Sequence, residues 1–311
     1  MSSQQLLRLA AVLAAVLVLW GVVALASRGS EGSTERGSIL VRIDTATIDT
    51  IALTEPGDTT TLTRDGTAAW RVNGHRAEAQ AVSELLEALV DTGASVELIA
   101  RNPSSHSRLR VTEDSGRRIR VVDGGRIALD LIAGKQTSDW AGVYLRRANQ
   151  PEVYVVRGDL PSALTRSGDE WRDRTIATVS PDSIGTIEIR RGSRSYKLLR
   201  KGSSWVFTSG ASADSVAVAN LISSYKNLEV DGFANAAQED SLSFARPRRT
   251  ARLLDRRGTP LLSLAFDSIA SGIWVRLADA RIGRPANGQA YRLETWTADR
   301  LTPAESTLRK Q

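Results

Sequence analysis

A chain of 311 residues with 41% hydrophobic and 24% charged side chains has the composition of a folded protein, and its length predicts two domains at roughly 150 residues each. The absence of cysteine excludes disulfides, thiolate metal sites and thiol nucleophiles. The formal net charge of +6 is a weak field, and no aromatic stacking motif accompanies the arginines, so nucleic acid is not an expected partner.

The N-terminal segment is apolar. Residues 9–26 read LAAVLAAVLVLWGVVALA, without a charge, and a helix at ~1.5 Å per residue would measure ~27 Å, close to the thickness of a bilayer core. We therefore expect a membrane anchor over residues 1–27 and a flexible, Gly/Ser-rich tether over residues 28–38. A cleaved signal peptide ending at Ala26 is the alternative. The anchor predicts a single-pass protein of the inner (cytoplasmic) membrane, with its N-terminus in the cytoplasm and the bulk of the chain extracytoplasmic.

The rest of the chain repeats one pattern, over residues 39–178 and again over residues 179–311. Each copy begins with a strand-like segment, which is followed by a second segment, a glycine turn and a tryptophan. The equivalent pairs are Ile48 and Ile184, Ile51 and Ile187, Leu53 and Ile189, Leu62 and Leu198, Arg64 and Arg200, Gly66 and Gly202, and Trp70 and Trp205. This order, found twice, predicts two tandem repeats.

An amphipathic helix follows each tryptophan. Its apolar positions recur at helical spacing, in the first copy at Val82, Leu85, Leu86, Leu89 and Val90, and in the second at Val218, Leu221, Ile222 and Tyr225. Glu78 and Asp214 stand at equivalent places in the first turn, where a negative charge favours the helix dipole. Each repeat is therefore predicted to contain one principal helix with a single apolar face.

Strand-rich segments complete each repeat. We expect hairpins around Ser115–Gly116 and Arg257–Gly258, followed by matching segments GVYLRR (residues 142–147) and GIWVRL (residues 272–277). The predicted fold class is α+β: an N-terminal transmembrane helix followed by two tandem repeats, each a mostly antiparallel sheet with one principal helix packed on a face.

These features resemble those of a family of bacterial membrane-anchored proteins, the domain of unknown function 4340 family. The resemblance consists of an apolar N-terminus, I-x-x-I-x-L, a basic residue before a glycine turn, tryptophan, a helix with L-L-x-x-L, and strands such as VYLRR and WVRL. It implies no established activity. Some relatives lie beside genes for ABC-type transport systems akin to those of gliding motility, which implies an accessory or scaffolding role.

No catalytic, cofactor-binding or metal-binding residues are predicted. His75 and His106 are the only histidines, and neither lies in a zinc-binding spacing. The chain lacks a G-x-S-x-G elbow, and the S-x-x-K match at residues 223–226 has no accompanying S-D-N or K-T-G. The carboxylates of SGDEWRDR are predicted to form surface ion pairs, because neighbouring arginines stabilise the ionised form.

Tryptophans fall into two groups. Trp70, Trp205 and Trp274 occupy positions that are aromatic in both copies, as does Tyr144, and are predicted to be core residues. Trp140, Trp171 and Trp296 have no aromatic counterpart, and the first two are the stronger candidates for contact with a partner. Together with Arg172 these two are the predicted partner-binding residues, since tryptophan and arginine are typical interface anchors; a spare core tryptophan is the alternative for either one.

Two functions remain. The first is a non-catalytic, membrane-anchored extracytoplasmic scaffold or accessory protein, with a membrane-protein partner such as an ABC-type transporter. The alternative is a periplasmic binding module for an anionic or glycan ligand, because basic runs such as SGRRIRV could contact anionic groups.

Overall fold

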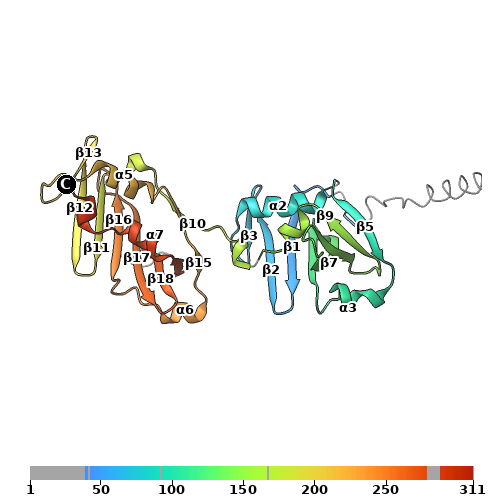
Figure 1. The fold of residues 1–311 in the computed structure, drawn as a ribbon. Helices are drawn as coiled ribbons and strands as arrows, with labels where there is room; N and C mark the ends of the chain where they lie inside the picture. Colours follow the sequence, from blue (N-terminus) through green and yellow to red (C-terminus); the bar gives the residue numbers. More distant parts are fainter. Residues whose placement is uncertain (1–38, 41–42, 92, 167, 279–287, 311) are drawn as a thin grey trace, which may run out of the picture. The chain divides into compact units, whose positions relative to one another are not determined.

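The computed structural model describes residues 39–40, 43–91, 93–166, 168–278 and 288–310. The chain divides into two compact units, Met1–Arg172 and Asp173–Gln311, called unit 1 and unit 2. In Figure 1 the described strands run from blue to green in unit 1 and from yellow to red in unit 2. Each unit is described by itself.

Unit 1 is built on one antiparallel sheet with the strand order β4-β3-β2-β1-β6-β7-β8-β9-β5. The strands are β1 (Ile48–Glu55), β2 (Asp58–Asp65), β3 (Ala69–Val72), β4 (His75–Arg76), β5 (Ser95–Ala100), β6 (Arg117–Asp123), β7 (Arg126–Gln136), β8 (Gly142–Arg147) and β9 (Val153–Arg157). Consecutive strands form hairpins, except that β1 pairs with β6 and β5 joins the far edge beside β9.

Unit 2 has an antiparallel sheet with the order β13-β12-β11-β16-β17-β18-β19-β15. Its strands are β11 (Thr186–Arg191), β12 (Arg194–Lys201), β13 (Ser204–Phe207), β15 (Gly232–Phe233), β16 (Arg249–Leu254), β17 (Pro260–Ile269), β18 (Gly272–Leu277) and β19 (Tyr291–Leu293). A separate pair joins β10 (Thr175–Thr178) to β14 (Asn227–Glu229). In both main sheets the first strand (β1 or β11) also pairs with a strand that follows the principal helix (β6 or β16), and the sheet ends with a strand that lies between these two in the chain (β5 or β15). The strand order is therefore the same apart from β4.

The helices are short. They are α2 (Ala79–Val90), α3 (His106–Leu109), α4 (Leu160–Ala163), α5 (Ser215–Ser223), α6 (Ala236–Ser241) and α7 (Thr295–Leu301), with 3-10 turns η1 (Pro103–Ser105), η2 (Gly168–Trp171), η3 (Pro181–Ser183) and η4 (Glu305–Leu308). The predicted principal helices are confirmed as α2 and α5. Their N-caps are Glu78 and Asp214, and the Asp214 carboxylate accepts from Ala217 N at 2.7 Å.

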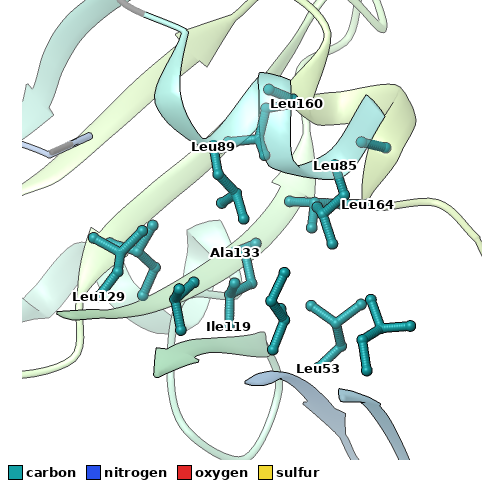
Figure 2. Close-up of a cluster of buried hydrophobic side chains, with 14 of the residues drawn as sticks. Leu53, Leu85, Leu89, Ile119, Leu129, Ala133, Leu160 and Leu164 are labelled. Atoms are coloured by element: carbon teal, nitrogen blue, oxygen red, sulfur yellow. The ribbon is translucent and has the colours of Figure 1, made fainter. Parts of the chain in front are cut away.

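The core of unit 1 lies between α2, α4 and one face of the sheet. Figure 2 shows Leu85 and Leu89 of α2, with Leu160 and Leu164 beside them, directed toward strand residues such as Leu53 and Ile119. These residues share the buried cluster because residues at i and i+4 on the helix, and at alternate positions on the strands, point the same way. The core of unit 2 is arranged in the same way, with Val218, Leu221 and Ile222 of α5 packed on one face of its sheet.

The recurrent arginine and tryptophan form a clamp in both units. In unit 1 the Arg64 guanidinium lies 4.6 Å from the centre of the Trp70 ring and donates from Nε to the Ile48 carbonyl at 2.6 Å. In unit 2 Arg200 lies 6.0 Å from the Trp205 ring and donates to the equivalent carbonyl, that of Ile184, at 3.4 Å. Trp70 and Trp205 are each 7% exposed, which confirms their assignment to the core.

One predicted hairpin is misplaced. The turn expected at Ser115–Gly116 lies instead at Gly124 and Gly125, both with positive φ, between β6 and β7. Residues 108–111 look like a strand because apolar and basic residues alternate, yet they end α3 and lead Val111 onto the outer face of the sheet, in a small cluster with Leu109, Ile132 and Val153. The hairpin around Arg257–Gly258 is confirmed by the pairing of β16 with β17.

The structure corrects the expected fold class and localisation. In the part of the chain that it describes, no helix combines the length and the apolar character needed to cross a bilayer. The longest described helix, α2, has 12 residues and one polar face. The α+β class with a transmembrane helix is therefore wrong, since the described chain is mostly antiparallel sheet, and a single-pass membrane localisation is not supported. The predicted anchor (1–27) and tether (28–38) lie outside the described residues.

Truncating either clamp tryptophan should destabilise its own unit. We expect Trp70→Ala and Trp205→Ala each to lower the free energy of unfolding by about 3 to 5 kcal/mol, the usual cost of removing a large buried aromatic side chain. Urea unfolding followed by circular dichroism measures this. The control is Trp140→Ala, whose side chain is 76% exposed and should change the free energy by less than about 0.5 kcal/mol; three equal effects would contradict the core assignment.

Candidate functional site

A groove of about 640 Å³ lies on the outer face of the unit 2 sheet. Its floor consists of side chains from β11, β12, β16 and β17 that point away from the core. On β11, for example, Ile187 and Ile189 are buried while Glu188 and Arg190 face the groove, because successive side chains of a strand point to opposite faces. The segment Leu242–Arg248 supplies a wall through Phe244, Ala245 and Pro247.

Cross-strand pairing assembles a row of charges on this floor. Glu188 lies opposite Lys197 on β12 and opposite Arg252 on β16. Its carboxylate is 2.9 Å from Lys197 Nζ and 3.9 Å from the nearest Arg252 guanidinium nitrogen. Arg252 in turn lies opposite Ser263 on β17, whose Oγ is buried without a hydrogen-bond partner among the described residues. Directly opposed polar side chains on adjacent strands are close enough to act together.

A second row carries Arg190. It lies between Ser195 and Thr250, and its Nη2 donates to the Pro247 carbonyl of the wall at 2.8 Å. The groove therefore holds three cationic side chains, Arg190, Lys197 and Arg252, around one carboxylate, that of Glu188. This excess of positive charge suits an anionic group.

Arg276 supports the wall of the groove. This residue of β18 donates to Glu239 of α6, and its guanidinium lies 4.5 Å from the centre of the Phe244 ring. The equivalent residue in unit 1, Arg146 of β8, is 7% exposed and donates from Nε to the Val111 carbonyl at 2.5 Å. The same strand position thus secures, in each unit, the segment beside the outer face of the sheet: the residues around Val111 in unit 1 and the wall of the groove in unit 2.

The predicted partner-binding residue Trp140 lies at the turn between β7 and β8 and is 76% exposed. Its φ of 60° is in the left-handed region, which is uncommon for a bulky residue. Thr137 closes the turn, with its N–H donating to the Gly142 carbonyl at 2.8 Å and its Oγ accepting from Gly142 N at 2.9 Å. Asp139 accepts from Thr137 Oγ1 and from Arg157 Nη1. These bonds fix the turn that carries the exposed indole.

The other two predicted partner-binding residues have a different environment. Trp171 is 0% exposed in the core of unit 1, with Arg166 at 5.5 Å from its ring. Its indole therefore does not share a surface with Trp140. The Arg172 side chain is 12% exposed, pairs with Asp169 at 3.5 Å, and lines a cavity of about 420 Å³ with His75. Burial and the charge of Arg172 lower the pKa of His75, against the opposing effect of Asp169.

Several carboxylates with a lowered pKa are engaged in ion pairs. Arg118 donates to both oxygens of Asp130 at 2.8 Å, and these bonds lower the pKa of Asp130. Arg166 likewise lowers the pKa of Glu84. Among the described residues, no group of three or more His, Cys, Asp or Glu side chains is placed to hold a metal ion. Because neighbouring arginines stabilise their ionised forms, these carboxylates are suited to binding or structural roles.

Sequence reasoning missed the groove, although one signal was present. The charges of Glu188, Lys197 and Arg252 alternate with buried residues on three strands, but their meeting depends on register, and β11 pairs with a strand about sixty residues later. The WVRL segment was recognised as a repeated strand. Its arginine was not recognised as the residue that secures the covering wall.

Comparison with known proteins gives one family. The model described as Domain of unknown function (DUF4340) matches residues 70–247. The match begins at Trp70 on β3 and ends in the loop before β16, so it includes the Trp140 turn and the β11 and β12 part of the groove. No curated protein matches the chain at a significant level.

The Trp140 turn predicts an acid-shifted carboxylate. Hydrogen bonds from Thr137 Oγ1, Arg157 and the Ala141 N–H lower the pKa of Asp139 from 3.8 to about 2. Because the folded value is below the unfolded one, the contribution of Asp139 to stability is complete above pH 3.8 and is lost as the pH falls toward 2. Carboxyl ¹³C NMR titration should give a midpoint near 2, raised in Thr137→Val and in Arg157→Gln. A wild-type midpoint at the ordinary value would show that these bonds do not form.

Proposed function

Since the chain belongs to the family described as Domain of unknown function (DUF4340), whose description assigns no activity, we propose a function from the geometry of unit 2: the chain is a non-catalytic binding module for an anionic ligand. The observation that carries this proposal is the groove floor, where Lys197 and Arg252 flank the single carboxylate of Glu188 and Arg190 adds a third cation to the lining. Ionised hydrogen-bond partners of this kind give stronger and more selective contacts than neutral ones.

An anionic ligand suits the groove better than a glycan does. A glycan site would present open aromatic faces, whereas the two aromatic residues of the lining are already engaged. Phe244 lies on Arg276, and Tyr196 packs against Phe207 and donates its hydroxyl to the Pro303 carbonyl at 2.7 Å.

We further propose that the two units are tandem copies of one module. Support comes from the common strand order, from the clamp pairs Arg64–Trp70 and Arg200–Trp205, and from Arg146 and Arg276 at the same position on β8 and β18. The charges of Glu188 and Lys197 are specific to the second copy, whereas the position of Arg252 is an arginine in both copies. Where Glu188 lies between Lys197 and Arg252, its counterpart Ala52 lies between Thr61 and Arg120. After a duplication, positions that differ between the copies are free to change in one of them and to bind a ligand there.

Neutralising the charged row should weaken binding of an acidic probe. Fluorescein-labelled hexaglutamate is a suitable probe, measured by fluorescence anisotropy at low ionic strength. The double variant Lys197→Gln/Arg252→Gln should bind at least about tenfold more weakly, a loss of about 1.4 kcal/mol, because two cationic contacts are removed. Added salt should weaken wild-type binding as it screens the exposed charges.

The matched control is Arg256→Gln/Arg257→Gln, which removes the same charge from the exposed β16–β17 turn and should bind as the wild type does. Maltotetraose, followed by calorimetry, tests the glycan alternative. Equal affinities of the two double variants, or binding of maltotetraose without binding of hexaglutamate, would contradict the proposal.

The exposure of Trp140 favours a second candidate function, that of an accessory or scaffold protein. An indole that is 76% exposed on a turn fixed by Thr137 and Asp139 has the properties of an interface anchor. The family resemblance makes a component of an ABC-type transport system the partner to look for. In this role Trp140 contacts the partner, while the buried Trp171 supports the core of unit 1.

Photo-cross-linking distinguishes this second function. A benzophenone amino acid at position 140 should give one cross-linked product in cells that naturally produce the chain, and mass spectrometry should identify a transport component. The control is the same amino acid at Ile127, which is 59% exposed. The absence of a product at position 140, or identical products at both positions, would contradict a scaffold role for this turn.

A further inference from the structure

A second cationic cavity, here called the basic pocket, lies within unit 1. Its volume is about 340 Å³, and its lining comes from the segment Arg110–Arg117, the end of β7, and the segment Pro161–Arg166. Four cationic side chains, those of Arg110, Arg117, Lys135 and Arg166, line it together with one carboxylate, that of Glu55. The excess of positive charge is therefore larger than in the unit 2 groove.

The backbone around Arg110 is held in place by close packing. Arg110 ends α3 with φ 57°, and its N–H donates to the Ser107 carbonyl at 3.2 Å. The segment lies so near β7 that a Cβ on Gly134 would come 2.2 Å from the Leu109 carbonyl, and a Cβ on Gly116 would come 2.8 Å from the Arg110 carbonyl. Both approaches require glycine. A left-handed conformation at a non-glycine residue persists only where the surroundings impose it.

Two of the four cations, Arg117 and Arg166, are anchored by neighbouring protein groups. Arg117 donates to the Leu164 carbonyl, to the Arg166 carbonyl at 3.0 Å, and to Glu55 at 3.3 Å, while its Nε is buried without a partner in the described structure. Arg166 pairs with Glu84 and lies over the ring of Trp171. Each of these arginines thus has a carboxylate that offsets part of its charge.

The other two cations, Arg110 and Lys135, have no such acid in the part of the chain that the structure describes. The Lys135 ammonium lies 5.9 Å from the Tyr144 ring centre. Both side chains line the cavity from exposed positions. A guanidinium and an ammonium in the lining of one small cavity offer a planar pair of donors and a point charge, the combination that suits phosphate oxygens.

We propose that the basic pocket binds the phosphate group of a phosphomonoester. A phosphomonoester carries a charge of about −1.5 to −2 at neutral pH and three acceptor oxygens, so it matches this pocket better than a single carboxylate does. The proposal concerns unit 1 alone and does not rest on the groove of unit 2. A soluble metabolite or the headgroup of a lipid could supply the same group.

Trp140 allows the two sources to be distinguished. Gln136 and Val143, on either side of the Trp140 turn, line the basic pocket. A lipid headgroup held in the pocket would therefore bring the bilayer interface to this exposed indole, where tryptophan is favoured. A soluble phosphomonoester would leave the indole in water.

The test uses the full chain and two probes that carry the same group. Calorimetry measures glycerol 3-phosphate, with glycerol as its neutral control. Cosedimentation measures neutral phosphatidylcholine vesicles with and without phosphatidic acid, whose headgroup is also a phosphomonoester. We expect Arg110→Gln/Lys135→Gln to weaken binding of the favoured probe at least about tenfold. Arg126→Gln/Lys201→Gln removes one arginine and one lysine from exposed positions elsewhere and should bind as the wild type does.

Each result decides the proposal. Binding of glycerol 3-phosphate that is lost in Arg110→Gln/Lys135→Gln supports a soluble ligand. Binding of phosphatidic acid vesicles, with a blue shift of tryptophan emission that is absent in Trp140→Phe, supports a lipid. Binding of neither probe, or equal binding by the two double variants, overturns the proposal. Lys135→Gln alone, at an exposed position, keeps the test valid if the Arg110 substitution disturbs folding, and should also weaken binding.

Discussion

Each sheet must bury one face. Because successive side chains of a strand point to opposite faces, the residues buried on that face determine which residues lie on the other. In unit 2 the burial of Ile187 and Ile189 leaves Glu188 and Arg190 on the outer face. Neither main sheet has a second layer of long helices in the described chain, so its outer face is covered only by short segments. Polar and charged residues can occupy this face because water reaches much of it. The groove is therefore a direct product of the one-sided core.

Arginine joins the two faces to the segments around them. Arg64 and Arg200 extend over a tryptophan and donate to a backbone carbonyl at or just before the first strand, that of Ile48 on β1 or of Ile184 ahead of β11, which ties the second strand of each sheet to the start of the unit. Arg146 and Arg276 hold the covering segment on the outer face. In unit 1 the segment brings apolar residues such as Val111 onto the sheet, whereas in unit 2 it stands at the side and leaves a cavity. The position of Arg146 and Arg276 thus secures a segment that covers the outer face in unit 1 and a segment that leaves a cavity on it in unit 2.

Much of this architecture could be predicted from periodicity. The apolar positions of α2, its cap at Glu78 and the burial of Trp70 and Trp205 all follow from local pattern. The outer-face sites could not be predicted in the same way. The groove requires the register between strands far apart in the chain, and Trp171, which lies between charged residues in the sequence, is buried. The alternating residues 108–111 were mistaken for a strand because their burial comes from the outer face, where α3 ends.

The strand order also bears on how the chain folds during synthesis. β5 occupies the edge beside β9, and Val96 and Leu98 of β5 contribute to the core of unit 1. That edge exists only after residues 153–157 have emerged from the ribosome, so β5 must wait while the β6–β9 hairpins form. Unit 2 has the same arrangement, with β15 beside β19 near the C-terminus. Each unit is therefore completed by its last strands, and unit 1 can close before unit 2 has been made.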